Sequence, residues 1–233
     1  MNRSGMNNRK LHNRSNAGMT MIEMVISFML LSLFVSAAAV VIFNVTNLYY
    51  HVRSENYARQ VADVVVNKIS SEITGAKYNK DFKSNRPIIY TNSATVENIT
   101  HEKADGSAIE LYDRTDTRIL IYANNGILRV YYYEIEDAEN EDNYRAATYW
   151  NYDRSIYNNY RMESLDFAQA GSDRNKTLAE AYGLEDVTPE DYADNVIAVY
   201  IRMVSPQYGP FTICRYVRIY NAPEEGCEIT LKN

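Results

Sequence analysis

The hydrophobic pattern of the chain begins with an uninterrupted apolar run at residues 24–43. These 20 residues carry no charge and include three serines. A helix rises about 1.5 Å per residue, so this run would extend for about 30 Å, which is the thickness of the hydrocarbon core of a bilayer. The run therefore predicts a membrane-spanning helix.

A different apolar pattern continues this helix. Residues 44–74 contain no proline and no glycine, and Gly75 then supplies a signal for the end of a helix. Apolar residues recur there at every fourth position, as in an amphipathic helix. The stripe consists of Val61, Val65, Ile69 and Ile73, with Tyr57 and Val64 beside it. We expect one helix from Met19 to Thr74, about 84 Å long, with its first half in lipid and its second half packed on a domain.

After Gly75 the pattern changes to short strands and turns. Asn124-Asn125-Gly126 lies between two runs rich in Ile, Leu, Val and Tyr, which is a strong hairpin signal. Short helical turns are expected at 176–182 and at Thr188–Asp191, where Pro189 would occupy the first helical position. Strands are expected at 87–91, 107–112, 118–123, 127–135, 160–167, 196–204 and 211–220.

These elements predict an α+β fold in which one long N-terminal helix packs on an antiparallel β-sheet built from the last 150 or so residues. The expected organisation has four segments. They are a basic leader at 1–18, a transmembrane half-helix at 19–45, an amphipathic half-helix at 46–75 and a β-rich globular domain at 76–233.

The residues before the apolar run set its orientation. Residues 1–18 contain four basic residues and no acidic one. The basic residues are Arg3, Arg9, Lys10 and Arg14. The positive-inside rule therefore places the N-terminus in the cytoplasm and everything after residue 45 outside, with a single pass through the cytoplasmic membrane.

Gly18 and Glu23 lie where the basic leader meets the apolar run. A carboxylate inside such a run costs about 2–3.5 kcal/mol on insertion scales, less near its end, and is usually functional. This arrangement resembles the N-terminus of a type IV prepilin or pseudopilin. The likeness covers about 30 residues.

The resemblance implies specific processing and assembly. Prepilin peptidase would cut between Gly18 and Met19, Met19 would be N-methylated, and Glu23 would become the fifth residue of the mature chain. Glu23 would then pair with the Met19 amine of a neighbouring subunit. The implied partners are other pilin or pseudopilin subunits, the peptidase and, before assembly, membrane lipid. The implied destination is an extracellular filament or a pseudopilus.

Major pilins often have a proline at the twenty-second mature position, where this chain has Val40. That difference and the size of the chain favour a minor subunit of a type IV pilus or of a type II secretion or competence pseudopilus.

Two other interpretations of the N-terminus remain open. An ordinary signal peptide could be cut near Ser36–Ala39, where small residues lie, and would release an exported enzyme. A plain single-span anchor would instead hold a surface adhesin or receptor. Neither explains both Gly18 and Glu23, and the apolar run continues past residue 39.

Charge argues against nucleic acid as a ligand. Without residues 1–18 the chain has 20 basic and 30 acidic residues, a net charge of −10. An electrostatic DNA-binding surface needs a basic patch, so we do not expect DNA as an electrostatic ligand.

Candidate chemistry is sparse. Cys214 and Cys227 would either form one disulfide outside the cell or leave Cys214 as a buried free thiol in a strand. The acidic stretch 134–142 offers hard ligands for calcium but lacks EF-hand spacing, so a solvated loop is expected. No catalytic, zinc-binding or phosphate-binding motif is present, and we expect no enzyme activity and no cofactor.

Overall fold

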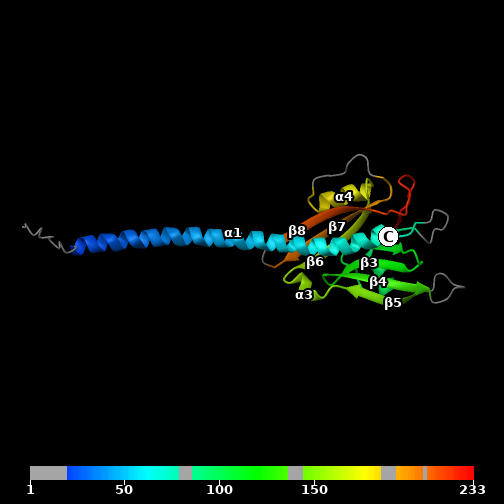
Figure 1. The fold of residues 1–233 in the computed structure, drawn as a ribbon, viewed down its shortest axis with the longest axis horizontal. Coiled ribbons are helices and arrows are strands. Elements are labelled where there is room, and N and C mark those ends of the chain that lie inside the picture. The colour runs from blue at the N-terminus through cyan, green and yellow to red at the C-terminus, as the bar shows by residue number, and fades with distance from the viewer. Residues whose placement is uncertain (1–19, 79–85, 136–143, 185–192, 207–208) are drawn as a thin grey trace, which may run out of the picture. The chain divides into compact units, whose positions relative to one another are not determined.

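The computed structural model describes residues 20–78, 86–135, 144–184, 193–206 and 209–233. The chain divides into two compact units, residues 1–50 and 51–233. Helix α1 (Met21–Gly75) runs through both of them and has 55 residues. Its bounds confirm the single long helix that the sequence predicts (Figure 1).

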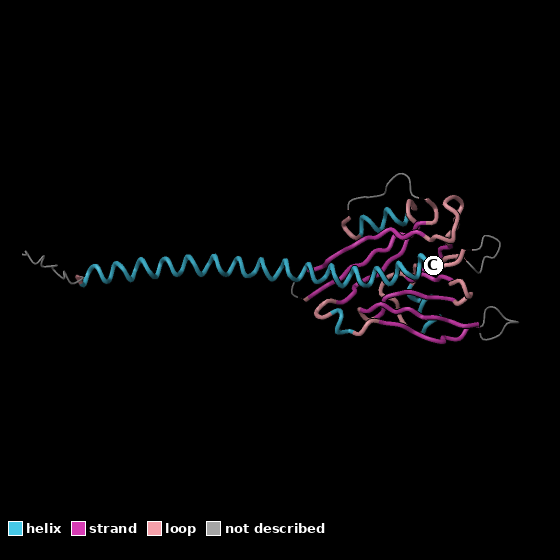
Figure 2. Tube along the Cα trace, in the orientation of Figure 1, coloured by secondary structure: helices cyan, strands magenta, loops and turns pink. Residues whose placement is uncertain are grey.

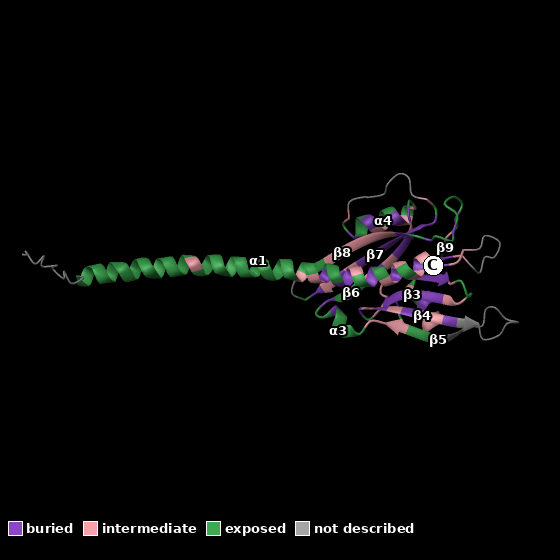
Figure 3. Cartoon of the chain, in the orientation of Figure 1, coloured by how far each residue is buried: buried purple, intermediate pink, exposed green. Residues whose placement is uncertain are grey.

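In the first unit the apolar side chains of α1 are exposed (Figure 3). Phe28, Leu33 and Phe34 are each 65–72% exposed. Within the described residues, α1 is long and apolar enough to cross a membrane. None of its most apolar 18-residue stretch is buried by the protein. Such a surface is unfavourable in water and requires lipid or other helices around it.

The second unit contains two β-sheets, which Figure 2 shows in magenta. The six-stranded sheet has the order β5-β4-β3-β2-β1-β9, and the three-stranded sheet the order β6-β7-β8. The strands of the first are β1 (Ile88–Tyr90), β2 (Ala108–Tyr112), β3 (Arg118–Asn124), β4 (Ile127–Ile135), β5 (Tyr144–Asn151) and β9 (Thr230–Lys232). The strands of the second are β6 (Arg161–Gln169), β7 (Val196–Ser205) and β8 (Gly209–Arg218). All pairs are antiparallel except β1 with β9.

The predicted α+β class is therefore confirmed. The sequence led us to expect one sheet, whereas the structure has two. Three short helices complete the second unit: α2 (Ser93–Thr100), α3 (Arg154–Tyr157) and α4 (Asp173–Ala181). Apolar residues of α2 join those of β1 and β3 in one cluster, while Ala179 and Tyr182 join those of β7 in another. The largest cluster takes residues from α1 and from both sheets, so the second half of α1 is the common core element of the unit.

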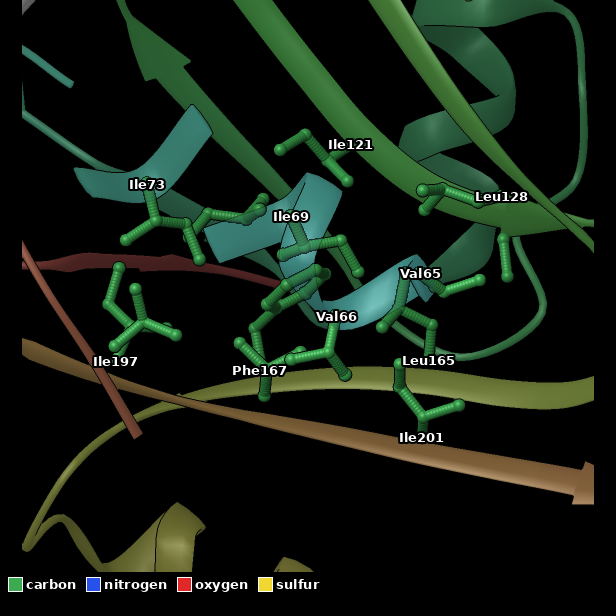
Figure 4. Close-up of a cluster of buried hydrophobic side chains, with 14 of the residues drawn as sticks. Val65, Val66, Ile69, Ile73, Ile121, Leu128, Leu165, Phe167, Ile197 and Ile201 are labelled. Carbon is green, nitrogen blue, oxygen red and sulfur yellow. The ribbon is translucent and has the colours of Figure 1, made fainter. Parts of the chain in front are cut away.

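The amphipathic stripe is the part of α1 that enters this core. Val61, Val65, Ile69 and Ile73 are at most 4% exposed. Figure 4 shows the last three of them among side chains from both sheets. Val66 joins them, whereas Val64, which was expected beside the stripe, is 40% exposed. Side chains 58, 62, 65, 66, 69 and 73 share a face, and position 64 lies off that face because each residue turns the helix by about 100°.

A polar contact fixes the same half of α1 to the six-stranded sheet. The Lys68 ammonium donates to Glu72 over 2.5 Å and to the Tyr132 hydroxyl over 3.0 Å, and it lies 4.7 Å from the centre of the Trp150 ring. The Tyr132 hydroxyl donates to Glu72 over 2.8 Å. Each polar group at this half-buried contact therefore has a partner, as burial requires.

The Asn-Gly hairpin is confirmed. Asn125 and Gly126 both have positive φ, 50° and 82°, as a two-residue type I′ turn requires, and β3 pairs with β4 across them. The helical turn expected at 188–191 lies outside the described residues. The one expected at 176–182 is found as α4, which begins slightly earlier behind the Ser172 cap.

Candidate functional site

The first turn of α1 holds the carboxylate that the sequence singles out. Glu23 Oε2 accepts hydrogen bonds from the Thr20 backbone N–H over 2.8 Å and from the Thr20 hydroxyl over 3.0 Å. In return the Glu23 backbone N–H donates to the Thr20 hydroxyl oxygen over 3.3 Å. This reciprocal arrangement is a capping box, in which Thr20 is the N-cap and Glu23 the third helical residue.

Thr20 was not singled out as a candidate site residue. The signal was present, because Thr-x-x-Glu directly before an apolar run is the sequence pattern of a capping box. The cap satisfies donors of the first turn that have no partner within the helix. Glu23 thus has a hydrogen-bond partner in its own chain, whereas the sequence led us to expect a partner in a neighbouring subunit.

The geometry of the cap leaves part of the carboxylate for another partner. Both bonds from Thr20 fall on Oε2, and the described residues provide no donor to Oε1. Glu23 is also the sole charged residue of positions 20–50. A negative charge at this end of a helix interacts favourably with the helix dipole, and it would also attract a cationic group brought to that end.

The serines of the apolar run are satisfied within the helix. The hydroxyls of Ser27, Ser32 and Ser36 donate to the carbonyls of Glu23, Met29 and Ser32 over 2.7–2.8 Å. Buried polar groups in lipid need such internal partners. The apolar part of α1 can therefore enter a bilayer with the Glu23 carboxylate as its one charged side chain.

Gly18 and Met19, the expected cleavage site, lie outside the described residues. The acidic stretch also lies mostly outside them, because residues 136–143 are not described. Among the residues that are described, no group of three or more His, Cys, Asp or Glu side chains is placed to hold a metal ion.

Both cysteines are free thiols in the structure. Cys227 is buried, whereas Cys214, which one alternative expected to be buried, is only partly buried. Cys214 packs with Tyr200 in the cluster that includes α4, whereas Cys227 lies in the cluster that includes α1. The two thiols thus belong to different clusters of the core. Burial raises the pKa of each to about 11, which keeps both protonated and poorly nucleophilic at neutral pH.

Comparison with known proteins agrees with the geometry of the first turn. A search of curated proteins found no match to this chain. Residues 13–39 match the family model of the prokaryotic N-terminal methylation motif. That match spans the last six residues of the basic leader, which end at Gly18, then the Thr20–Glu23 cap and most of the apolar run. The N-terminal segment of this chain is therefore that of a type IV prepilin-like protein.

Proposed function

We propose that this chain is a minor structural subunit of a type IV pilus or of a type II secretion or competence pseudopilus. It is matured by prepilin peptidase after Gly18 and assembled through its N-terminal helix. The observation that carries the proposal is the capped Glu23 at the head of an exposed apolar helix, within the matched methylation motif. The motif suggests a structural role and not an enzymatic one.

The cap explains how one carboxylate serves the subunit before and after assembly. Cleavage would leave a positive α-amine on Met19, next to the helix end where the dipole is also positive. The negative charge of Glu23, held at the helix end by the bonds of Oε2 to Thr20, offsets the positive charge of the amine and the dipole. Its Oε1 stays open for the Met19 amine of a neighbour. The pair would remove two unpaired charges from lipid and fix the axial register of the incoming subunit.

The proposed organisation follows from the two helix halves. Residues 19–45 hold the chain in the cytoplasmic membrane with residues 1–18 in the cytoplasm, and then form the helical core of the filament. Residues 46–75 are the spine of the outward domain 76–233. The buried stripe on α1 supports this division, since it joins the half-helix to the core of both sheets.

Recovery in sheared filaments tests the assembly role. Wild-type chain should copurify with the filament or overexpressed pseudopilus, whereas Gly18→Leu should remain in the membrane fraction with its leader attached. A chain that stays in the membrane in wild-type form, while known subunits of the same cell shear off, would contradict the proposal and favour an anchored adhesin or receptor.

A further inference from the structure

Strand β9 is the outermost strand at one edge of the six-stranded sheet and covers β1 there. Strand β9 pairs in parallel with β1, with Ile88 opposite Thr230 and Tyr90 opposite Lys232. All three residues of β1 are buried, at most 8% exposed. All three residues of β9 are exposed, and Leu231 is 53% exposed. A fully buried strand is thus covered by one that buries almost no side chain.

What holds β9 in place is mostly main chain. The Thr230 N–H donates to the Pro87 carbonyl over 3.0 Å, and the Thr91 N–H donates to the Lys232 carbonyl over 2.9 Å. The Thr91 hydroxyl adds a bond of 2.6 Å to Asn233, and the Lys232 ammonium lies 5.5 Å from the centre of the Tyr90 ring. An identical strand from another molecule could make every one of these contacts.

The chain just before β9 is firmly attached. Cys227 is 3% exposed, and its carbonyl accepts from the Gln169 side chain over 3.1 Å. The Glu228 N–H donates to the Tyr78 hydroxyl over 3.0 Å, and its carboxylate pairs with Arg86. Separation of β9 therefore requires the chain from Ile229 onward to leave, and Ile229 is partly buried against the largest cluster. The five residues 229–233, when extended, reach about 17 Å.

We propose that the edge of β1 is a strand-accepting site, and that on close approach of two copies the C-terminal strand of one replaces that of the other. The occupant is identified by the structure, since β9 shows which sequence and which register fit this edge. An uncovered edge of a buried strand is a template for pairing, so an open β1 does not stay empty. The short reach of residues 229–233 limits exchange to copies in direct contact. This inference concerns residues 51–233 and does not depend on the proposed role of the N-terminal helix.

A peptide tests the acceptor site. A labelled peptide of residues 228–233 is titrated into full-length chain in detergent and into chain truncated after Glu228. It should bind the truncated chain saturably and the full-length chain about tenfold or more weakly, because there β9 competes. The matched control carries a methyl group on the Thr230 backbone nitrogen, which removes the donor to Pro87 and no side chain. Equal binding of the two peptides, or no binding to truncated chain with a native circular dichroism spectrum, would overturn the proposal.

A second measurement uses intact chains and decides the matter if truncation disrupts folding. A photo-crosslinking phenylalanine replaces exposed Leu231 in an isotopically labelled copy, which is mixed with unlabelled chain and irradiated. Exchange predicts crosslinks from position 231 of one copy to the β1 peptide of the other, increasing with concentration. Crosslinks confined to single molecules at every concentration would refute exchange.

Discussion

The Thr20 backbone N–H donates to Oε2 of Glu23 over 2.8 Å, and the Glu23 N–H donates back to the Thr20 hydroxyl over 3.3 Å. The same carboxylate thus caps its own helix through Oε2, and in the proposed assembly its Oε1 would accept from the Met19 amine of a neighbour. The two roles make different demands on the side chain, since a cap needs an acceptor and an ion pair needs a charge.

Substitutions at these two residues separate the roles. Glu23→Gln keeps an acceptor for the cap and loses the charge, so it should insert into the membrane normally but disappear from sheared filaments. Thr20→Val loses the capping hydroxyl and keeps the charge, so it should cost about 0.5–2 kcal/mol of helix stability and still assemble. Immunoblots of filament and membrane fractions measure both. If Glu23→Gln assembles as well as wild type, charge pairing with the Met19 amine is not required.

The buried stripe should carry much of the stability of residues 46–233. Ile69→Ala removes a fully buried side chain and should lower the free energy of unfolding by about 2–5 kcal/mol. Val64→Ala, on the exposed side of the same helix, should change it by less than about 0.5 kcal/mol. Denaturant unfolding of the fragment gives both values, and similar effects at the two positions would show that the stripe does not pack in solution.

Truncation tests whether the half-helix belongs to the domain. A fragment of residues 46–233 should be folded and monomeric, whereas 76–233 would expose the apolar faces that α1 covers and should aggregate. Size-exclusion chromatography with near-ultraviolet circular dichroism distinguishes the two states. A well-folded, monomeric 76–233 fragment would mean that α1 is a detached stalk.

Buried tyrosines predict loss of stability at high pH. Burial raises the pKa of Tyr157 to about 12, above its ordinary value of about 10, while its hydroxyl oxygen accepts from the Leu128 N–H over 2.9 Å. Between these values the folded state keeps a proton that the unfolded chain has lost, so stability is complete below about pH 10 and falls as the pH rises to 12.

Replacement of that hydroxyl tests the same residue at neutral pH. Tyr157→Phe leaves the buried Leu128 N–H without its acceptor and should cost about 1–3 kcal/mol. It should also make the alkaline decline less steep, whereas Tyr220→Phe, at a residue 73% exposed, should do neither. Unfolding curves between neutral pH and pH 12 measure both effects, and an unchanged alkaline slope in Tyr157→Phe would contradict the assignment.

A glycine joins the two sheets. Gly106 has a φ of 105° and pairs with Leu165 in an isolated bridge, and a β-carbon at 106 would lie 2.4 Å from the Leu165 carbonyl oxygen. Gly106→Ala should therefore cost about 1–3 kcal/mol more than Gly171→Ala, which shares the positive φ but has open space around it. Equal melting temperatures for the two variants would show that the close approach is not maintained.

Local patterns predicted the elements that depend on local signals. The apolar run, the stripe at every fourth position and Asn125-Gly126 are each defined within one continuous segment of the sequence. The structure confirms the helix and the hairpin that they predict. Strand β5 and helix α2 were missed because neither has a clear apolar period. Strand β9 has three exposed residues, so its pairing with β1 depends on the tertiary fold and not on its own sequence.

The division into two sheets also lies beyond a single sequence. Strand order depends on which distant segments meet, as at Gly106 and Leu165, and no local signal specifies that contact. At the candidate site, Glu23 was found because a charge beside an apolar run is anomalous. Its bond to Thr20 was not predicted, although the Thr-x-x-Glu spacing allows it.

The most direct test of the account is the mass of the N-terminal peptide of the protein recovered from the membrane fraction. Maturation as a prepilin predicts a chain that starts at Met19 with a methylated amine. It also predicts an uncut leader in Gly18→Leu, because a bulky residue would not fit a site built for glycine. A start near Val40 would instead indicate an ordinary signal peptide, and an intact leader on the wild-type chain would indicate a plain anchor. Either result would contradict maturation as a prepilin.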